Sequence, residues 1–176
     1  KPIEINPTHD LPELARTLKR TGRLQVPNFF TDESAEYLYQ LLVEHKNWYL
    51  AYNNGGQFCE STMEQLDALT PQQREKFMGN INRRAQTQFQ YIFRQYYISQ
   101  AIQLNEHPGD PMHQMHAFMN SDETLEIMRT ITGDSTISKA DSYASMYKPG
   151  DFLTTHDDRH EKHDRVAAYV FSMTKN

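Results

Sequence analysis

The chain has 176 residues, with 18 basic and 23 acidic side chains, a formal net charge of -5 and a hydrophobic content of 38%. This length fits one domain, and this hydrophobic content is enough for a core, so a largely disordered chain is excluded. The acidic excess argues against a protein built chiefly to hold phosphate backbones, and the single cysteine, Cys59, excludes an internal disulfide and a cysteine-based zinc site.

The N-terminal third predicts a strand, a helix and a hairpin in turn. Residues 22–30 have the pattern of a short strand that enters a turn. Thr31 or Asp32 can then cap a helix that runs to about His45. The aromatic-rich start of 47–56 is typical of a strand and its Asn-Asn-Gly-Gly end of a turn, so this segment predicts a hairpin arm.

Two capping patterns predict the next helices. Residues 61–64, Ser-Thr-Met-Glu, have the pattern of a capping box for a short helix. Thr70 begins a second pattern, with Pro71 at the first helical position and Gln73 at the third. Apolar residues then recur at roughly the helical period, so we expect the longest helix from Pro71 to about Tyr97. These residues are Phe77, Ile81, Phe89, Ile92, Phe93 and Tyr96.

The basic and aromatic side chains of this segment allow a second interpretation. Arg83 and Arg84 precede a cluster of phenylalanines and tyrosines, and together these are the ingredients of a surface that binds single-stranded nucleic acid. The spacing is that of an amphipathic helix, so packing in the core is the favoured interpretation.

Residues 112–133 predict further helical structure. His113 and His116 lie three apart on one helix turn, and without a nearby carboxylate or cysteine we interpret them as ordinary structure rather than a metal site. Ser121 predicts the cap of a helix that stops at Gly133.

The most specific motif is Tyr-Lys-Pro-Gly-Asp-Phe-Leu-Thr-Thr-His-Asp-Asp at 147–158, a turn and an apolar stretch that end in His-x-Asp. On a strand, residues two apart point the same way, so His156 and Asp158 can share one divalent metal while Asp157 faces the other side. An imidazole and a carboxylate are two thirds of the facial triad that holds non-heme Fe(II) with positions left for a cosubstrate and O2. The alternative is a solvated loop, because both charge signs alternate over 156–165.

Three residues beyond the motif have two interpretations each. His160 and His163 can reach a metal, but three ligands at this spacing on one strand fit one face of an octahedron poorly, so we interpret both as loop residues. Arg165 is either a charged residue at the start of a strand over 166–171 or a contact with a carboxylate or peptide substrate, which the planar guanidinium favours.

Segments 140–158 and 165–174 resemble the iron(II)- and 2-oxoglutarate-dependent dioxygenases of the prolyl hydroxylase type. The resemblance extends to 24–36, 120–122 and 131–134, and so covers most of the chain. It implies an α+β fold, in which a double-stranded β-helix (a cupin-like jelly roll) follows an N-terminal helical layer. The whole chain would form one dioxygenase domain.

The resemblance also implies a set of site residues. His156 and Asp158 match the first two iron ligands, and Tyr147 matches a tyrosine whose hydroxyl reaches 2-oxoglutarate. Fe(II), 2-oxoglutarate and O2 are the implied cofactor and cosubstrates, with ascorbate as a candidate addition. A second histidine and a basic residue for the far carboxylate are expected beyond Asn176, together with the rest of the jelly roll.

The implied function is hydroxylation of a substrate C–H bond, with a prolyl residue of a protein or peptide as the first expectation. One alternative is a non-catalytic jelly-roll module that binds a protein or nucleic acid, and another is an enzyme that uses the roll for metal chemistry without 2-oxoglutarate. We expect a cytoplasmic protein with a protein or peptide partner and without membrane or nucleic-acid partners. No feature of the chain predicts an oligomeric state.

Overall fold

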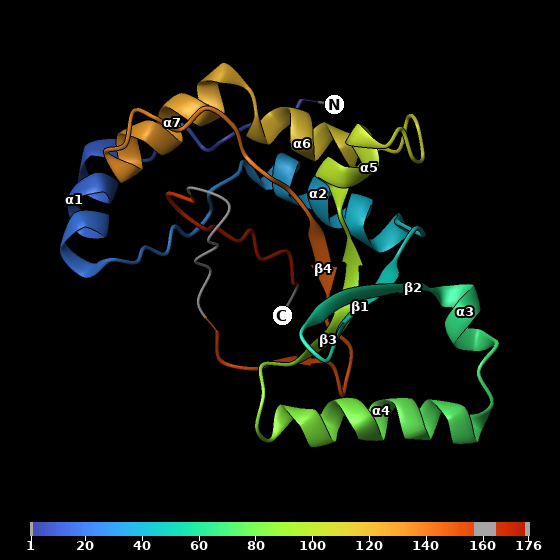
Figure 1. Ribbon diagram of the computed structural model, residues 1–176. Helices are drawn as coiled ribbons and strands as arrows, with labels where there is room; N and C mark the ends of the chain where they lie inside the picture. Colours follow the sequence, from blue (N-terminus) through green and yellow to red (C-terminus); the bar gives the residue numbers. More distant parts are fainter. Residues whose placement is uncertain (1, 157–164, 175–176) are drawn as a thin grey trace. The chain divides into compact units, whose positions relative to one another are not determined.

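The computed structural model describes residues 2–156 and 165–174, and it combines helices with an antiparallel sheet (Figure 1). The α+β class predicted from the sequence is therefore confirmed. The chain divides into two compact units. Within the described residues, unit 1 comprises 2–45, 98–142 and 165–174, and unit 2 comprises 46–97 and 143–156. The single dioxygenase domain stays a prediction.

Unit 2 is built around a five-stranded antiparallel sheet in the order β2-β1-β3-β4, with β5 also paired to β3. The strands are β1 (Tyr49–Asn54), β2 (Gln57–Thr62), β3 (Tyr91–Tyr96), β4 (Ala144–Met146) and β5 (Phe152–Leu153). Gly55 and Gly56 join β1 to β2, and both have positive φ angles that glycine adopts readily. The predicted hairpin over 47–56 is confirmed, although its second strand extends further.

β4 and β5 pair with successive parts of the same edge of β3. Arg94 lies opposite Met146, and Ile92 lies opposite Phe152. Between these pairs, the segment 147–151 lies opposite Phe93 alone, so the chain loops out of the sheet at this point. The residues on either side of this loop, Met146 and Phe152, are therefore both paired with β3.

Two helices accompany the sheet of unit 2, α3 (Met63–Asp67) and α4 (Pro71–Ala85). Leu50, Ile81 and Ile92 form the buried core between α4 and one face of the sheet. Partly buried side chains surround this core, namely Tyr52, Met63, Leu66, Phe77, Met78 and Phe152. The alternate residues of β3, including Tyr91 and Phe93, therefore lie on the other face.

The helix caps of unit 2 follow the sequence closely. Thr70 accepts the N–H of Gln73 while the Gln73 side chain accepts the N–H of Thr70, which is the predicted capping box of α4. The box of α3 joins Thr62 and Gln65, one residue later than predicted.

The predicted helix from Pro71 to about Tyr97 is wrong beyond Ala85, because Tyr91–Tyr96 forms β3. This stretch reads Tyr-Ile-Phe-Arg-Gln-Tyr, and aromatic and β-branched residues favour strands. Most of its positions are apolar or aromatic, so it fits the helical period and the strand period about equally well. Pairing with β1 on one edge and β4 on the other decides the outcome.

Unit 1 contains five helices within the described residues. They are α1 (Leu11–Thr21), α2 (Asp32–Glu44), α5 (Ile98–Gln103), α6 (His113–Met119) and α7 (Asp122–Thr132). α7 packs against α1, and α6 contacts both α5 and α7. The predicted caps are confirmed: Thr31 caps α2, Ser121 caps α7, and Gly133 ends α7 with a φ of 74°.

Two predicted strands of unit 1 are wrong in the described residues. Residues 22–29 are not a strand, and only Phe30 forms an isolated bridge, with Ile5. Segment 165–174 has no regular secondary structure, so the strand expected over 166–171 is absent from this part of the chain. An apolar stretch forms a strand only where a neighbouring strand can pair with it. In this segment the ring of Phe171 packs on that of Phe30, with centroids 4.7 Å apart.

No helix in the described part of the chain has both the length and the apolar character needed to cross a membrane.

Candidate active site

A row of aromatic rings runs along β3 on the face of the sheet that α4 does not cover. Ring centroids are 5.5 Å apart between Phe89 and Tyr91, and 5.7 Å apart between Tyr91 and Phe93. These distances are typical of favourable aromatic pairs. We call Phe89, Tyr91 and Phe93 the aromatic row. Burial raises the pKa of Tyr91 to about 12, with Cys59 and Glu60 adding to the effect, so its phenol stays protonated.

Tyr147 lies at one end of the aromatic row. Its ring stacks on that of Phe93, with centroids 5.0 Å apart and planes 21° from parallel. The side chain is 50% exposed, so its hydroxyl can meet a ligand. Burial raises the pKa of Tyr147, and Tyr143 and Asp151 raise it further. The hydroxyl therefore remains a hydrogen-bond donor at neutral pH.

The turn after Tyr147 is the one that the sequence predicts. The Asp151 N–H donates to the carbonyl oxygen of Lys148 over 2.9 Å, and Gly150 has a φ of 92°. Proline at the second position and glycine at the third suit a type II turn, because the third residue needs a positive φ. The Asp151 carboxylate accepts the Lys148 N–H over 2.8 Å and also pairs with the guanidinium of Arg94.

His156 lies at the other end of the aromatic row, with its ring centroid 5.7 Å from that of Phe89. Backbone pairing continues past β5 as far as Thr154, whose N–H donates to the carbonyl oxygen of Gln90, just before β3, over 2.9 Å. The predicted strand thus ends before His156. Thr155 lies between the last paired residue, Thr154, and the exposed imidazole of His156.

The contact of the His156 ring indicates its tautomer. Nδ1 lies 3.1 Å from the carbonyl oxygen of Thr154. A carbonyl oxygen only accepts, so Nδ1 carries the hydrogen and the lone pair of the neutral ring is on Nε2. Histidines that bind metals usually donate their second ring nitrogen to a carbonyl or carboxylate in this way. His156 therefore fits the role of a metal ligand.

The other predicted site residues stay predictions. Asp157 and Asp158 lie outside the described residues, as do His160 and His163, so the same-face pairing of His156 with Asp158 stays a prediction. Arg165 is an exposed residue of unit 1. Within residues 2–156 and 165–174, no group of three or more histidine, cysteine, aspartate and glutamate side chains could hold a metal ion.

Arg83 and Arg84 do not share a surface with the aromatic row. Both lie in the last turn of α4, the helix that covers the opposite face of the sheet. Arg84 donates to the side-chain oxygen of Asn54 over 2.6 Å, and Arg83 donates to that of Asn80 over 3.3 Å. The combination of basic and aromatic side chains that suggests nucleic-acid binding in the sequence is thus divided between two faces.

His116 belongs to a hydroxyl network in unit 1. Its Nδ1 lies 2.8 Å from Oγ of Ser142 and 3.2 Å from Oγ of Ser99. Burial lowers the pKa of His116, which favours the neutral imidazole that such a network needs. These contacts agree with a structural role for this histidine.

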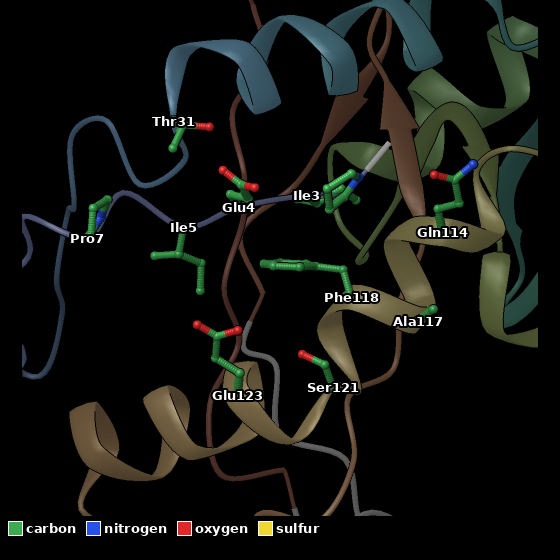
Figure 2. Close-up of a pocket in the computed structure, with 11 residues that line it drawn as sticks. Ile3, Glu4, Ile5, Pro7, Thr31, Gln114, Ala117, Phe118, Ser121 and Glu123 are labelled. Atoms are coloured by element: carbon green, nitrogen blue, oxygen red, sulfur yellow. The ribbon is translucent and has the colours of Figure 1, made fainter.

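Unit 1 also contains a cavity of about 630 Å³ that none of the predicted site residues lines. Figure 2 shows the Phe118 ring projecting into it between Ile3 and Ile5 of the N-terminal segment. Ser121 and Glu123, at the start of α7, lie on its opposite side. Its walls are mainly apolar, with carboxylates from Glu4 and Glu123.

Sequence reasoning missed the aromatic row and the pairing of Arg94 with Asp151. Phe89, Tyr91 and Phe93 alternate with other residues, and this period of two was the available signal for a strand face. The ion pair joins residues far apart in the sequence, so no local pattern could reveal it.

Comparison of the chain with models of protein families, with curated proteins and with solved structures gave no match.

Proposed function

We propose that the chain belongs to an Fe(II)- and 2-oxoglutarate-dependent dioxygenase that hydroxylates a C–H bond, most simply that of a prolyl residue in a protein or peptide. The observation that carries this proposal is the position of Tyr147 and His156 at the two ends of one aromatic row. The motif at 147–158 supplies both residues, and its resemblance to the prolyl hydroxylase type gives each a role.

In this proposal, His156 through Nε2 and Asp158 would hold the metal, and the resemblance requires a second histidine as well. Fe(II) with 2-oxoglutarate supplies the activation of O2 for C–H oxidation. The Tyr147 hydroxyl, which is protonated at neutral pH, would donate a hydrogen bond to the cosubstrate. The contact of Thr154 with Nδ1 orients the imidazole.

The jelly roll is part of the same proposal. The antiparallel sheet of unit 2 would be one wall of the roll, with the aromatic row on its inner face. We also propose that Arg165 contacts the substrate, since a guanidinium binds carboxylates and peptide carbonyls well. The cytoplasm is the proposed location, because the sequence has a single cysteine.

Metal binding to the full-length protein tests the ligand set. His156→Ala and Asp158→Ala should each weaken Mn(II) binding by at least about tenfold in isothermal titration, whereas Asp157→Ala is the matched control and should have a smaller effect. Equal losses at all three positions would contradict the strand geometry.

Turnover tests the reaction class. With Fe(II) loaded anaerobically and air then admitted, the wild-type protein should consume 2-oxoglutarate and release succinate, slowly even without substrate, and His156→Ala should not. Metal binding without any consumption of 2-oxoglutarate would favour an enzyme that uses the metal in another way.

The rival is a non-catalytic module that binds a protein or nucleic acid. Two exposed rings favour it: Phe89, within the aromatic row, is 45% exposed, and Phe58, beside the row, is 53% exposed. The rival predicts that the wild-type protein neither binds nor consumes 2-oxoglutarate.

A further inference from the structure

Arg94 and Asp151 form an ion pair that joins β3 to the turn after Tyr147. Nη1 of Arg94 bonds Oδ2 of Asp151, and the two side chains are only 20% and 7% exposed. A charged pair this well buried loses much of its hydration, so it persists only in a defined geometry with other polar partners. The pair therefore holds the turn at a fixed position on β3 and is not a solvent-exposed surface ion pair.

The Asp151 carboxylate has a second partner within the turn. Oδ2 also accepts the backbone N–H of Lys148 over 2.8 Å. The same oxygen thus holds both the strand and the first residue of the turn. Because Lys148 follows Tyr147 directly, this contact limits how far the backbone of Tyr147 can move away from β3.

The loop is held from both faces of β3. Phe93 and Arg94 are consecutive, so their side chains point to opposite faces of the strand. Phe93 stacks on Tyr147 on one face, and Arg94 pairs with Asp151 on the other. Segment 147–151 lies outside the regular pairing, so these two contacts replace the missing ladder hydrogen bonds.

We propose that Arg94 and Asp151 are positioning residues that set the orientation of the Tyr147 hydroxyl toward the 2-oxoglutarate carboxylate. This inference rests on the proposed function for its ligand, but its geometric part stands on the contacts alone. Losing the pair should let the Tyr147 ring leave Phe93 part of the time while the backbone fold of unit 2 remains.

Three variants of the full-length protein distinguish the effect of the charges of Arg94 and Asp151 from the effect of their side-chain shapes. Arg94→Gln removes the cation, and Arg94→Lys keeps the charge but lacks the planar fork. Asp151→Asn has nearly the same shape and keeps an oxygen for the Lys148 N–H, but its charge is lost. Ile81→Val is the control, since it loosens the core on the face of β3 that Arg94 shares but leaves both charged side chains in place.

The first readout does not involve activity. In protein labelled with fluorotyrosine, Tyr147→Phe identifies the ¹⁹F resonance of residue 147. Arg94→Gln and Asp151→Asn should shift or broaden that resonance, Arg94→Lys should do so less, and Ile81→Val should not. An unchanged resonance in both charge-removing variants would overturn the proposal.

The second readout is the KM for 2-oxoglutarate. We expect Arg94→Gln and Asp151→Asn to raise it roughly two- to tenfold, the cost of one weakened hydrogen bond, with Mn(II) affinity unchanged. A shifted resonance with an unchanged KM would overturn the role toward the cosubstrate. A shifted resonance in a protein whose wild type never consumes 2-oxoglutarate would instead reject the proposed function and leave the positioning of Tyr147 intact.

Discussion

At the scale of single residues, the candidate site depends on which groups carry a proton. Tyr147 has a raised pKa and stays a donor, and His156 uses Nδ1 toward a carbonyl oxygen, which puts its lone pair on Nε2. A donor and a coordinating nitrogen are what an anionic cosubstrate and a cation require.

Replacing Tyr147 by phenylalanine isolates its hydroxyl. The ring that stacks on Phe93 remains, and only the hydrogen bond is lost, at about 0.5–1.5 kcal/mol, or up to about 3 kcal/mol if the partner is charged. The KM for 2-oxoglutarate should therefore rise several-fold, while Mn(II) affinity stays within about twofold of wild type. Succinate release across a cosubstrate series measures the constant.

Tyr143→Phe is the matched control for this variant. Tyr143 is 59% exposed and its ring contacts that of Tyr97. Although Tyr143 raises the pKa of Tyr147, a phenol is protonated at neutral pH without that contribution, so removing the Tyr143 hydroxyl should have little effect on the KM. Equal KM values for 2-oxoglutarate in the wild type and in Tyr147→Phe would show that Tyr147 is a packing residue.

At the scale of helices and strands, the sequence predicts best where a short-range hydrogen bond defines the element. Thr31, Thr70 and Ser121 each cap a helix, as expected, because a cap joins a hydroxyl to an N–H three residues later. The Lys-Pro-Gly-Asp turn is equally local. Such elements depend on their own residues more than on distant partners.

β3 could not be predicted in the same way. Its sequence fits the helical period and the strand period about equally well, and its pairing with β1 and β4 decides that it is a strand. The helical period gives no sign of the aromatic row, whereas the His-x-Asp spacing indicates His156 and the family resemblance indicates Tyr147. The same limit applies to segment 165–174, in which Phe171 packs on the rings of Phe29 and Phe30 in unit 1.

Two glycines of unit 2 offer a matched test of the turn. Gly150 has a φ of 92°, whereas Gly79 lies exposed in α4, and an added Cβ at either position would meet nothing within 4 Å. Gly150→Ala should destabilise unit 2 by about 1 kcal/mol or more from backbone strain alone, and Gly79→Ala should stabilise it by roughly 0.4–1 kcal/mol. Urea unfolding monitored by circular dichroism compares the two.

The test depends on the two substitutions changing the stability of unit 2 in opposite directions. Destabilisation by both substitutions would indicate that α4 cannot accept a methyl group at position 79. A neutral Gly150→Ala would show that the turn adopts another conformation in solution.

At the scale of the whole molecule, the chain passes between the two units repeatedly. Unit 2 takes β1, β2 and β3 from 46–97 but β4 and β5 from 143–156, and the helices α5, α6 and α7 of unit 1 lie between these segments in the sequence. Neither unit is a continuous stretch that could be cut out. The sheet of unit 2 requires both of its segments, because β3 pairs with β1 on one edge and with β4 and β5 on the other.

This connectivity leads us to expect one cooperative unfolding transition, as the single-domain prediction requires. Ile81→Ala in the core of unit 2 and Leu125→Ala in α7 of unit 1 each truncate a side chain that is at most 6% exposed. Each should cost about 2–5 kcal/mol and lower the same Tm by several degrees. Leu104→Ala, at a residue 56% exposed, should change it little. Calorimetry of the full-length protein makes the comparison. Two separate transitions, each sensitive to only one of the core substitutions, would contradict the single domain and give the two units independent stability.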